Sequence, residues 1–188
     1  MLFRSDKINH LFIDNEKPLI VEIGCYQGKT LIEMSSLNQT YNFLGLDITY
    51  KRVVKTARKI KREMLTNSHV AACDGRYLFE HVLADESILG LCVFFPDPWP
   101  KDRHEKNRLL NKEMVELIYR KLKPNGFFWF KTDHGLYYEA VHHKLLERGF
   151  HVSTGKQPSC LTNAPYETNF QKLFTEKKTP YFDKVYLK

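Results

Sequence analysis

Acidic residues follow several apolar segments of this sequence at points where a small ligand could bind. Glu22 opens the stretch Glu22–Gly28, and Asp47 and Asp74 close the next two apolar runs. Glycines where a strand turns into a helix let the backbone bend sharply and approach a ligand closely. An acidic residue about 20 residues beyond such a turn can accept hydrogen bonds from ribose hydroxyls. This spacing predicts a site for a nucleoside.

The glycine turn differs from the fingerprint of dinucleotide-binding proteins. It lacks G-x-G-x-x-G, because Tyr26 stands where a middle glycine would be. A pyrophosphate needs that closely approached backbone, whereas a nucleoside without phosphates needs it less. S-adenosylmethionine carries a sulfonium and an ammonium group, which suit nearby carboxylates. We therefore predict an S-adenosylmethionine site that contains Glu22, Gly24, Gly28, Asp47 and Asp74. The alternative is a tight turn with a charged edge.

A stiff loop follows the fourth apolar run, where Phe94–Lys101 reads F-F-P-D-P-W-P-K. Its three prolines restrict the backbone, and such rigidity matters where Asp97 and Trp99 must be held in register with a substrate. A purely structural turn with Trp99 buried is the alternative. Four cations come next, at Lys101, Arg103, Lys106 and Arg108. Side chains of this kind contact phosphates without reading sequence.

Alternating strands and helices would position these residues. Buried-strand patterns cover Leu19–Ile23, Phe43–Ile48, Val70–Cys73, Ile88–Phe95 and Gly126–Lys131. Amphipathic helical patterns cover Thr49–Leu65, Lys112–Leu122 and His134–Arg148. This order predicts an α/β fold in which helices cover both faces of a parallel sheet. Phe150–Ser153 and Thr168–Phe174 are predicted to be two late strands, paired antiparallel at one edge.

The composition is that of one globular domain over residues 1–188, because 43% of the residues are hydrophobic and 27% are charged. No apolar run reaches the length of a membrane span, and the first residues show no signal-peptide pattern. Four separated cysteines without a C-x-x-C pair predict reduced thiols rather than disulfides or a zinc finger. We expect a cytoplasmic protein that binds neither a membrane nor a metal.

Positive charge predominates, since 29 Lys and Arg residues face 22 Asp and Glu residues for a net charge of +7. Such an excess suits a polyanionic partner. The residues 51–62 read K-R-V-V-K-T-A-R-K-I-K-R, with no acidic residue before Glu63. The wet face of an amphipathic helix is the favoured interpretation of this run, and RNA contact is the alternative.

The segment F-P-D-P-W-P-K-D-R-H-E-K-N-R at Phe95–Arg108 resembles the signature of the TrmB family of tRNA (guanine-N7)-methyltransferases. The resemblance extends in order over nearly the whole chain, through Glu22–Gly28, Gly45–Ile48 (G-L-D-I), Phe130–Asp133 (F-K-T-D) and Thr168–Gln171 (T-N-F-Q). It implies a Rossmann-like class I methyltransferase fold with a mostly parallel, seven-stranded sheet. It also implies methyl transfer from S-adenosylmethionine to N7 of a variable-loop guanine in tRNA. We expect the enzyme to be a monomer or homodimer.

The resemblance also implies roles for individual residues. Asp97 would be the catalytic carboxylate and would also contact the cofactor. The guanine would be held by Lys101, Asp133, Thr168 and Gln171. The RNA would be contacted by Arg103, His104, Lys106 and Arg108.

Three features depart from the family pattern. Tyr26 replaces the middle glycine of the turn, and Glu105 and Asn107 interrupt a run that is usually more basic. Gln171 stands where the family usually has glutamate. An amide offers one acceptor where a carboxylate could accept from both N1–H and N2–H of guanine. This change predicts weaker guanine selectivity, or a reliance on Asp133 or Glu167.

Two other activities stay open. The D-P-W sequence loosely resembles the loop of amino methyltransferases, which would modify an exocyclic amine such as N6 of adenine. A non-catalytic RNA-binding subunit could also keep the same fold. The four acidic residues argue against that subunit, whereas Tyr26 and Gln171 keep it open.

Overall fold

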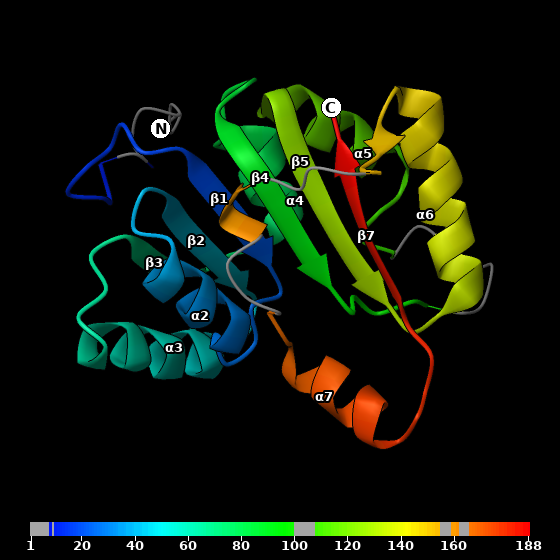
Figure 1. Ribbon diagram of the computed structural model, residues 1–188. Coiled ribbons are helices and arrows are strands. Elements are labelled where there is room, and N and C mark those ends of the chain that lie inside the picture. Colours follow the sequence, from blue (N-terminus) through cyan, green and yellow to red (C-terminus); the bar gives the residue numbers. More distant parts are fainter. Residues whose placement is uncertain (1–7, 9, 100–107, 155–158, 162–165) are drawn as a thin grey trace.

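The computed structural model describes residues 8, 10–99, 108–154, 159–161 and 166–188, and Figure 1 shows its ribbon. Strands and helices alternate in the order β1 (Leu19–Ile23), α2 (Lys29–Leu37), β2 (Asn42–Asp47), α3 (Tyr50–Arg62), β3 (Ser68–Ala72), α4 (Gly75–His81), β4 (Ile88–Phe94), α5 (Lys112–Lys121), β5 (Leu122–Thr132), α6 (Gly135–Arg148), β6 (His151–Val152), α7 (Asn169–Glu176) and β7 (Phe182–Leu187). A short 3₁₀ helix, Ser159–Leu161, precedes α7. The five predicted parallel strands are confirmed, with ends displaced by a few residues.

Seven strands form one sheet in the spatial order β3-β2-β1-β4-β5-β7-β6. Strands β1 to β5 pair in parallel, whereas β7 runs antiparallel to both β5 and β6. The predicted class I fold, with its antiparallel edge pair, is confirmed. The winding direction reverses between the neighbours β1 and β4. In open α/β sheets, ligands bind in the crevice outside the carboxyl ends of the strands at such a reversal.

Helices cover both faces of the sheet, as the sequence predicts. Val21 packs with Ile118 of α5 and Val141 of α6 in one buried cluster. The adjacent Ile20 points to the opposite face, where it packs with Met34 of α2 and Ile60 of α3. Figure 1 shows α2 and α3 in front of the sheet and α4 and α5 behind it. Parallel strands covered on both sides need apolar residues at nearly every position, which explains their continuous hydrophobic runs.

The segment after β6 contradicts the sequence prediction. Thr168–Phe174 is not a strand, because helix α7 begins immediately after Thr168. The Thr168 Oγ1 atom accepts a hydrogen bond from the backbone N–H of Gln171 at 2.9 Å, which caps the helix. The spacing Thr-x-x-Gln is a capping-box pattern that would have predicted a helix here. The strand that pairs with β6 is β7, which the sequence interpretation missed together with the short helix α4.

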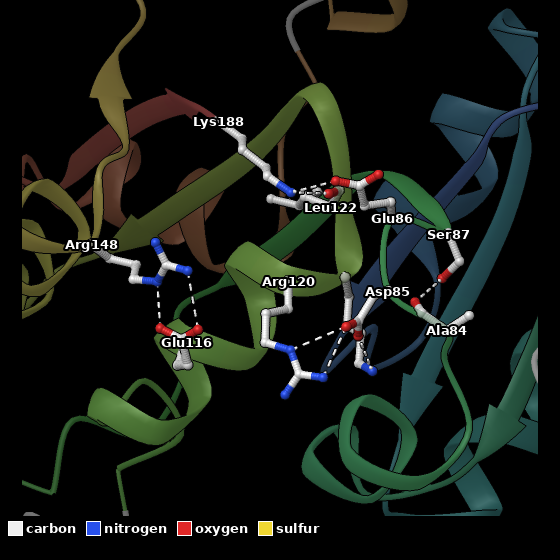
Figure 2. A network of polar contacts seen from close by, with 10 residues as sticks. Ala84, Asp85, Glu86, Ser87, Glu116, Arg120, Leu122, Arg148 and Lys188 are labelled. Atoms are coloured by element: carbon white, nitrogen blue, oxygen red, sulfur yellow. Dashed lines mark hydrogen bonds and ion pairs between the residues drawn. The ribbon is translucent and has the colours of Figure 1, made fainter.

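Ion pairs lie at the end of the sheet where β4 and β5 begin. Asp85 accepts from Arg120 at 2.9 Å and from Lys121 at 2.8 Å, and Glu116 pairs with Arg148 (Figure 2). The Arg120 and Arg148 pairs are partly exposed, and exposed pairs of this kind contribute at most about 1 kcal/mol each. They lie at the end of the sheet opposite to the carboxyl ends of the parallel strands. None of the helices in the described part of the chain combines the length and apolarity that a membrane span requires.

Candidate active site

A cleft of about 440 Å³ opens at the carboxyl ends of four neighbouring strands, β3, β2, β1 and β4. One acidic residue from each strand end lines it: Glu22, Asp47, Asp74 and Asp97. The two cationic residues among its described lining are Lys29 and Arg52. The volume is within the roughly 300–1,000 Å³ range of small-molecule sites. The described lining thus has more acidic than basic residues, a balance that suits a small cationic ligand.

Glu22, like Asp47, is buried, with 5% of its surface exposed. Its Oε2 atom has no hydrogen-bond partner among the described residues. Burial raises the pKa of the Glu22 carboxyl to about 8, and a hydrogen bond from the Leu31 backbone offsets this only partly. A buried carboxyl oxygen without a partner at the cleft is a ready acceptor for a cationic group.

Asp47 and Asp74 also organise the local backbone. The Asp47 carboxylate accepts from the N–H groups of Thr49 at 2.8 Å and Tyr26 at 3.1 Å. Asp74 accepts from the N–H of Arg76 at 2.7 Å and thereby caps α4. Each carboxylate oxygen has two lone pairs, so both residues retain acceptor capacity for a ligand.

The two predicted glycines have different positions at the turn. Gly24 lines the cleft with a φ of 80°, a conformation that favours glycine. Gly28, with a φ of 70°, is not among the lining residues. A Cβ atom at Gly28 would lie 2.3 Å from Cγ2 of Thr56. Gly28 therefore allows the start of α2 to pack closely against α3.

Tyr26 gives the turn a contact that a glycine could not make. Its φ of 50° lies in the left-handed region. The Arg52 guanidinium lies 4.5 Å from the centre of the Tyr26 ring, and the centre of the Phe170 ring of α7 lies 6.3 Å from it. Tyr26, which replaces the usual glycine, thus connects the turn to both α3 and α7 at the cleft.

Replacing Tyr26 separates the cost of its backbone conformation from the value of its ring. Both Y26A and Y26G lose the ring contacts with Arg52 and Phe170, but only glycine adopts a positive φ without strain. We therefore expect Y26G to be more stable than Y26A by about 1 kcal/mol. Urea denaturation of the two variants measures this difference. An alanine variant as stable as the glycine variant would show that the turn changes its conformation.

The proline loop presents Asp97 and Trp99 to the cleft. Asp97 is exposed and has no hydrogen bond or ion pair with a described residue. Trp99 is 40% exposed, so the alternative of a turn built around a buried tryptophan is wrong. Arg108 donates to the carbonyl oxygens of Pro98 at 3.0 Å and Trp99 at 3.2 Å. Arg108, predicted to contact RNA, therefore also closes the base of this loop.

Other predicted contacts lie outside the cleft or outside the described residues. Asp133 is exposed after β5 and is not among the lining residues. The structure does not describe Lys101, Arg103, His104 or Lys106. Thr168 is buried and lines the cleft, so the start of α7 forms part of its wall.

Gln171 holds α7 to the sheet. Its Oε1 atom accepts a hydrogen bond from Lys131 at 2.7 Å, and its Nε2 atom donates to the Tyr181 hydroxyl at 3.0 Å. Lys131 has only donors, so it fixes the orientation of the amide. Gln171 is not among the residues that line the cleft. Gln171, which stands where the family usually has glutamate, thus anchors α7, and the first turn of α7 borders the site.

Lys131 supports the wall of the cleft through its contact with Gln171, and the sequence interpretation did not single it out. The residue is 1% exposed, and its ammonium has three acceptors: Gln171, the Tyr166 carbonyl at 3.2 Å and Asp183 at 3.1 Å. Burial lowers the pKa of Lys131, whereas Asp183 opposes that shift. A lysine inside an otherwise apolar strand was the available signal, because a buried charge needs partners.

Comparison with known proteins assigns the family. Residues 16–184 match the protein family described as "Putative methyltransferase". The chain belongs to this methyltransferase family. It is 38% identical over 127 residues to the tRNA (guanine-N(7)-)-methyltransferase of Syntrophotalea carbinolica, across 68% of this chain and 55% of that relative. With the same-named protein of Nitrosomonas eutropha it shares 33% identity over 149 residues, across 79% of this chain and 63% of the relative.

These relatives confirm the resemblance to tRNA (guanine-N7)-methyltransferases that the sequence motifs indicate. The methyltransferase chain spans only a little over half to under two thirds of their length. A solved SAM-dependent methyltransferase from Aquifex aeolicus shares its fold, with a TM-score of 0.59 over 99% of this chain and 89% of that one. At 14% identity this match supports the fold alone. Among the described residues, no group of His, Cys, Asp or Glu could hold a metal ion.

Proposed function

We propose that this methyltransferase transfers a methyl group from S-adenosylmethionine to N7 of guanine in tRNA. The observation that carries the proposal is the ring of four acidic strand ends around one nucleoside-sized cleft. The shared identity with tRNA (guanine-N(7)-)-methyltransferases supports the choice of acceptor. The variable-loop guanine is the acceptor that the family resemblance implies.

The cleft residues fit the proposed methyl donor. The Oε2 atom of Glu22 has no hydrogen-bond partner among the described residues, and a bound cationic group would favour the ionised form of this carboxyl. Asp47, the last residue of β2, would accept from ribose hydroxyls, and Asp74, just after β3, would meet the adenine edge. When bound, S-adenosylmethionine supplies an electrophilic methyl group attached to a sulfonium.

Methylation of guanine N7 requires alignment of the reacting atoms and no proton transfer. Guanine N7 carries a free lone pair, so its methylation removes no proton and needs no general base. N7, the methyl carbon and the sulfonium must be in line. Holding reactants in such a geometry can lower a barrier by about 7–11 kcal/mol in favourable cases. The proline loop, stiffened by its prolines, is suited to hold the purine in this position.

Asp97 is suited to orient the purine and to stabilise its developing charge. Positive charge passes from sulfur to the guanine ring as the new N–C bond forms and the S–C bond breaks. The Asp97 carboxylate faces the cleft without a partner among the described residues, so it is available to this charge. Trp99 presents an exposed aromatic face at the same wall of the cleft. We assign Asp97 an orienting role rather than proton abstraction.

A methyl-transfer assay with product mapping tests the proposal. The protein is incubated with tritiated S-adenosylmethionine and tRNA transcribed in vitro, and the digested nucleosides are identified by mass spectrometry. We expect 7-methylguanosine as the product. N6-methyladenosine would instead identify an amino methyltransferase. Binding of tRNA without any transfer would identify a non-catalytic RNA-binding subunit.

A further inference from the structure

Helix α3 carries a line of cations on its outer face. Lys51, Lys55, Arg58 and Arg62 follow the spacing i, i+4, i+7 and i+11, which places them along one side of a helix. All four are exposed. We call this set the basic stripe; it extends about 16 Å along the helix axis.

The other faces of α3 have different contacts. Val53, Thr56 and Ile60 are buried toward the sheet. Lys59 donates to the carbonyl oxygen of Gln27 at 2.8 Å, and Arg52 pairs with Asp47 at 3.6 Å. These two cations support the glycine turn and the cleft. The basic stripe is therefore the part of the helix that has no internal role in positioning the site.

Few of these charges are neutralised within the protein. Arg62 pairs with its neighbour Glu63 at 3.1 Å, whereas Lys51, Lys55 and Arg58 form no ion pair with a described residue. None of the 13 residues of α3 is acidic, although the chain contains 22 Asp and Glu residues. A solvated helix face ordinarily intersperses both signs of charge.

The arrangement is unfavourable for the isolated helix. Lys51 and Lys55, and likewise Arg58 and Arg62, are like charges four residues apart, which repel each other. The first turn contains cations and no acid, although the helix dipole favours the reverse. A bound polyanion would compensate for both effects, which a merely wet surface would not.

We propose that the basic stripe binds the sugar-phosphate backbone of the substrate tRNA. This inference rests on the proposed function and adds a docking surface to it. Arg52, at the start of α3, lines the cleft, so the stripe begins next to the cleft. Figure 1 shows α3 running from there alongside α2. RNA is favoured over a lipid surface, because the apolar face of α3 is buried in the core and cannot insert into a membrane.

The test compares two triple variants that remove equal charge. K51A/K55A/R58A removes most of the stripe. K17A/R120A/K123A removes three cations near the amino ends of β1 and β5, among them Arg120 of the Figure 2 ion pairs, so thermal unfolding of this control is measured as well. The affinity for tRNA is measured from low to high salt. We expect the stripe variant to bind about tenfold more weakly at low salt, and its log–log salt slope to be shallower by about 2 to 3. The control variant should keep the wild-type slope.

Further measurements on both variants distinguish the possible outcomes. Both variants should bind S-adenosylmethionine as the wild type does in calorimetry, and the stripe variant should melt at the same temperature or higher. A stripe variant with the salt slope and the KM for tRNA of the control would overturn the inference while the proposed function stands. Stripe-dependent tRNA binding without methyl transfer would overturn the function but keep the docking surface. Stripe-dependent binding to anionic vesicles, with tRNA binding unchanged, would identify a lipid surface and overturn the inference.

Discussion

D97A is expected to lower the turnover number for methyl transfer to tRNA by about 100-fold or more, and to leave the affinity for tRNA within about twofold of wild type. The carboxylate is exposed at the wall of the cleft, and its removal breaks no hydrogen bond or ion pair with the described part of the chain. The loss should therefore appear in the chemical step and not in stability. Single-turnover kinetics with tritiated donor measure the step, and thermal unfolding checks the fold.

A second substitution separates charge from hydrogen bonding at the same position. D97N keeps the size and an acceptor oxygen but removes the negative charge. If Asp97 stabilises positive charge on the purine, D97N should be nearly as slow as D97A. If it only grips the base through a hydrogen bond, D97N should recover much of the rate. Turnover of D97A within threefold of wild type would remove Asp97 from the mechanism.

E22Q is expected to weaken binding of S-adenosylmethionine at least tenfold at pH 8 to 9 and to abolish its pH dependence. In the free protein the pKa of Glu22 is raised to about 8, so the carboxyl is largely protonated at neutral pH. A cationic ligand favours the ionised form, so binding releases a proton below that pKa. Wild-type affinity should therefore rise with pH and level off above about pH 8. Calorimetry at several pH values, in buffers of different ionisation enthalpy, measures affinity and proton release.

The same substitution should have the opposite effect on the stability of the free protein. Because the folded pKa exceeds the ordinary carboxyl value of 4.5, the native state binds more protons than the unfolded state between pH 4.5 and about 8. Glu22 therefore lowers the free energy of unfolding as pH rises through this window, by at most about 1.4 kcal/mol per pH unit. E22Q lacks this loss and should exceed the wild type in stability at pH 9, with little difference near pH 4.5. Urea denaturation measures the free energy of unfolding of both proteins against pH. The same pH dependence in both would contradict the burial of an uncompensated carboxyl at Glu22.

The opposed signs of these two effects are informative together. If Glu22 served stability, a neutral substitute would not make the protein more stable. If it serves ligand binding, a neutral substitute can make the protein more stable. Weaker donor binding in a more stable protein would place Glu22 at the ligand. Reduced stability at every pH would instead indicate a structural role.

The parallel strands and the acidic residues at their ends could be predicted from the sequence. Strands buried on both faces leave continuous apolar runs, and the residues that follow such runs must lie at one edge of the sheet. Glu22, Asp47, Asp74 and Asp97 therefore line one cleft in the structure, as their positions along the chain indicate. The conclusion depends on local periodicity and topology, and not on how any individual side chain packs.

The surroundings of the cleft were decided by tertiary structure. Lys131 and Gln171 are 40 residues apart and meet only because α7 packs against the end of β5. By contrast, the local Thr-x-x-Gln capping pattern is enough to predict the helix that begins after Thr168, although the apolar residues of Thr168–Phe174 alone suggest a strand. The joint contact of Tyr26 with Arg52 and Phe170 links three separate segments. Sequence determined which acids gather at the strand ends, because strand direction fixes them; only the packed chain determined which side chains enclose them, since those contacts depend on the shapes of distant segments.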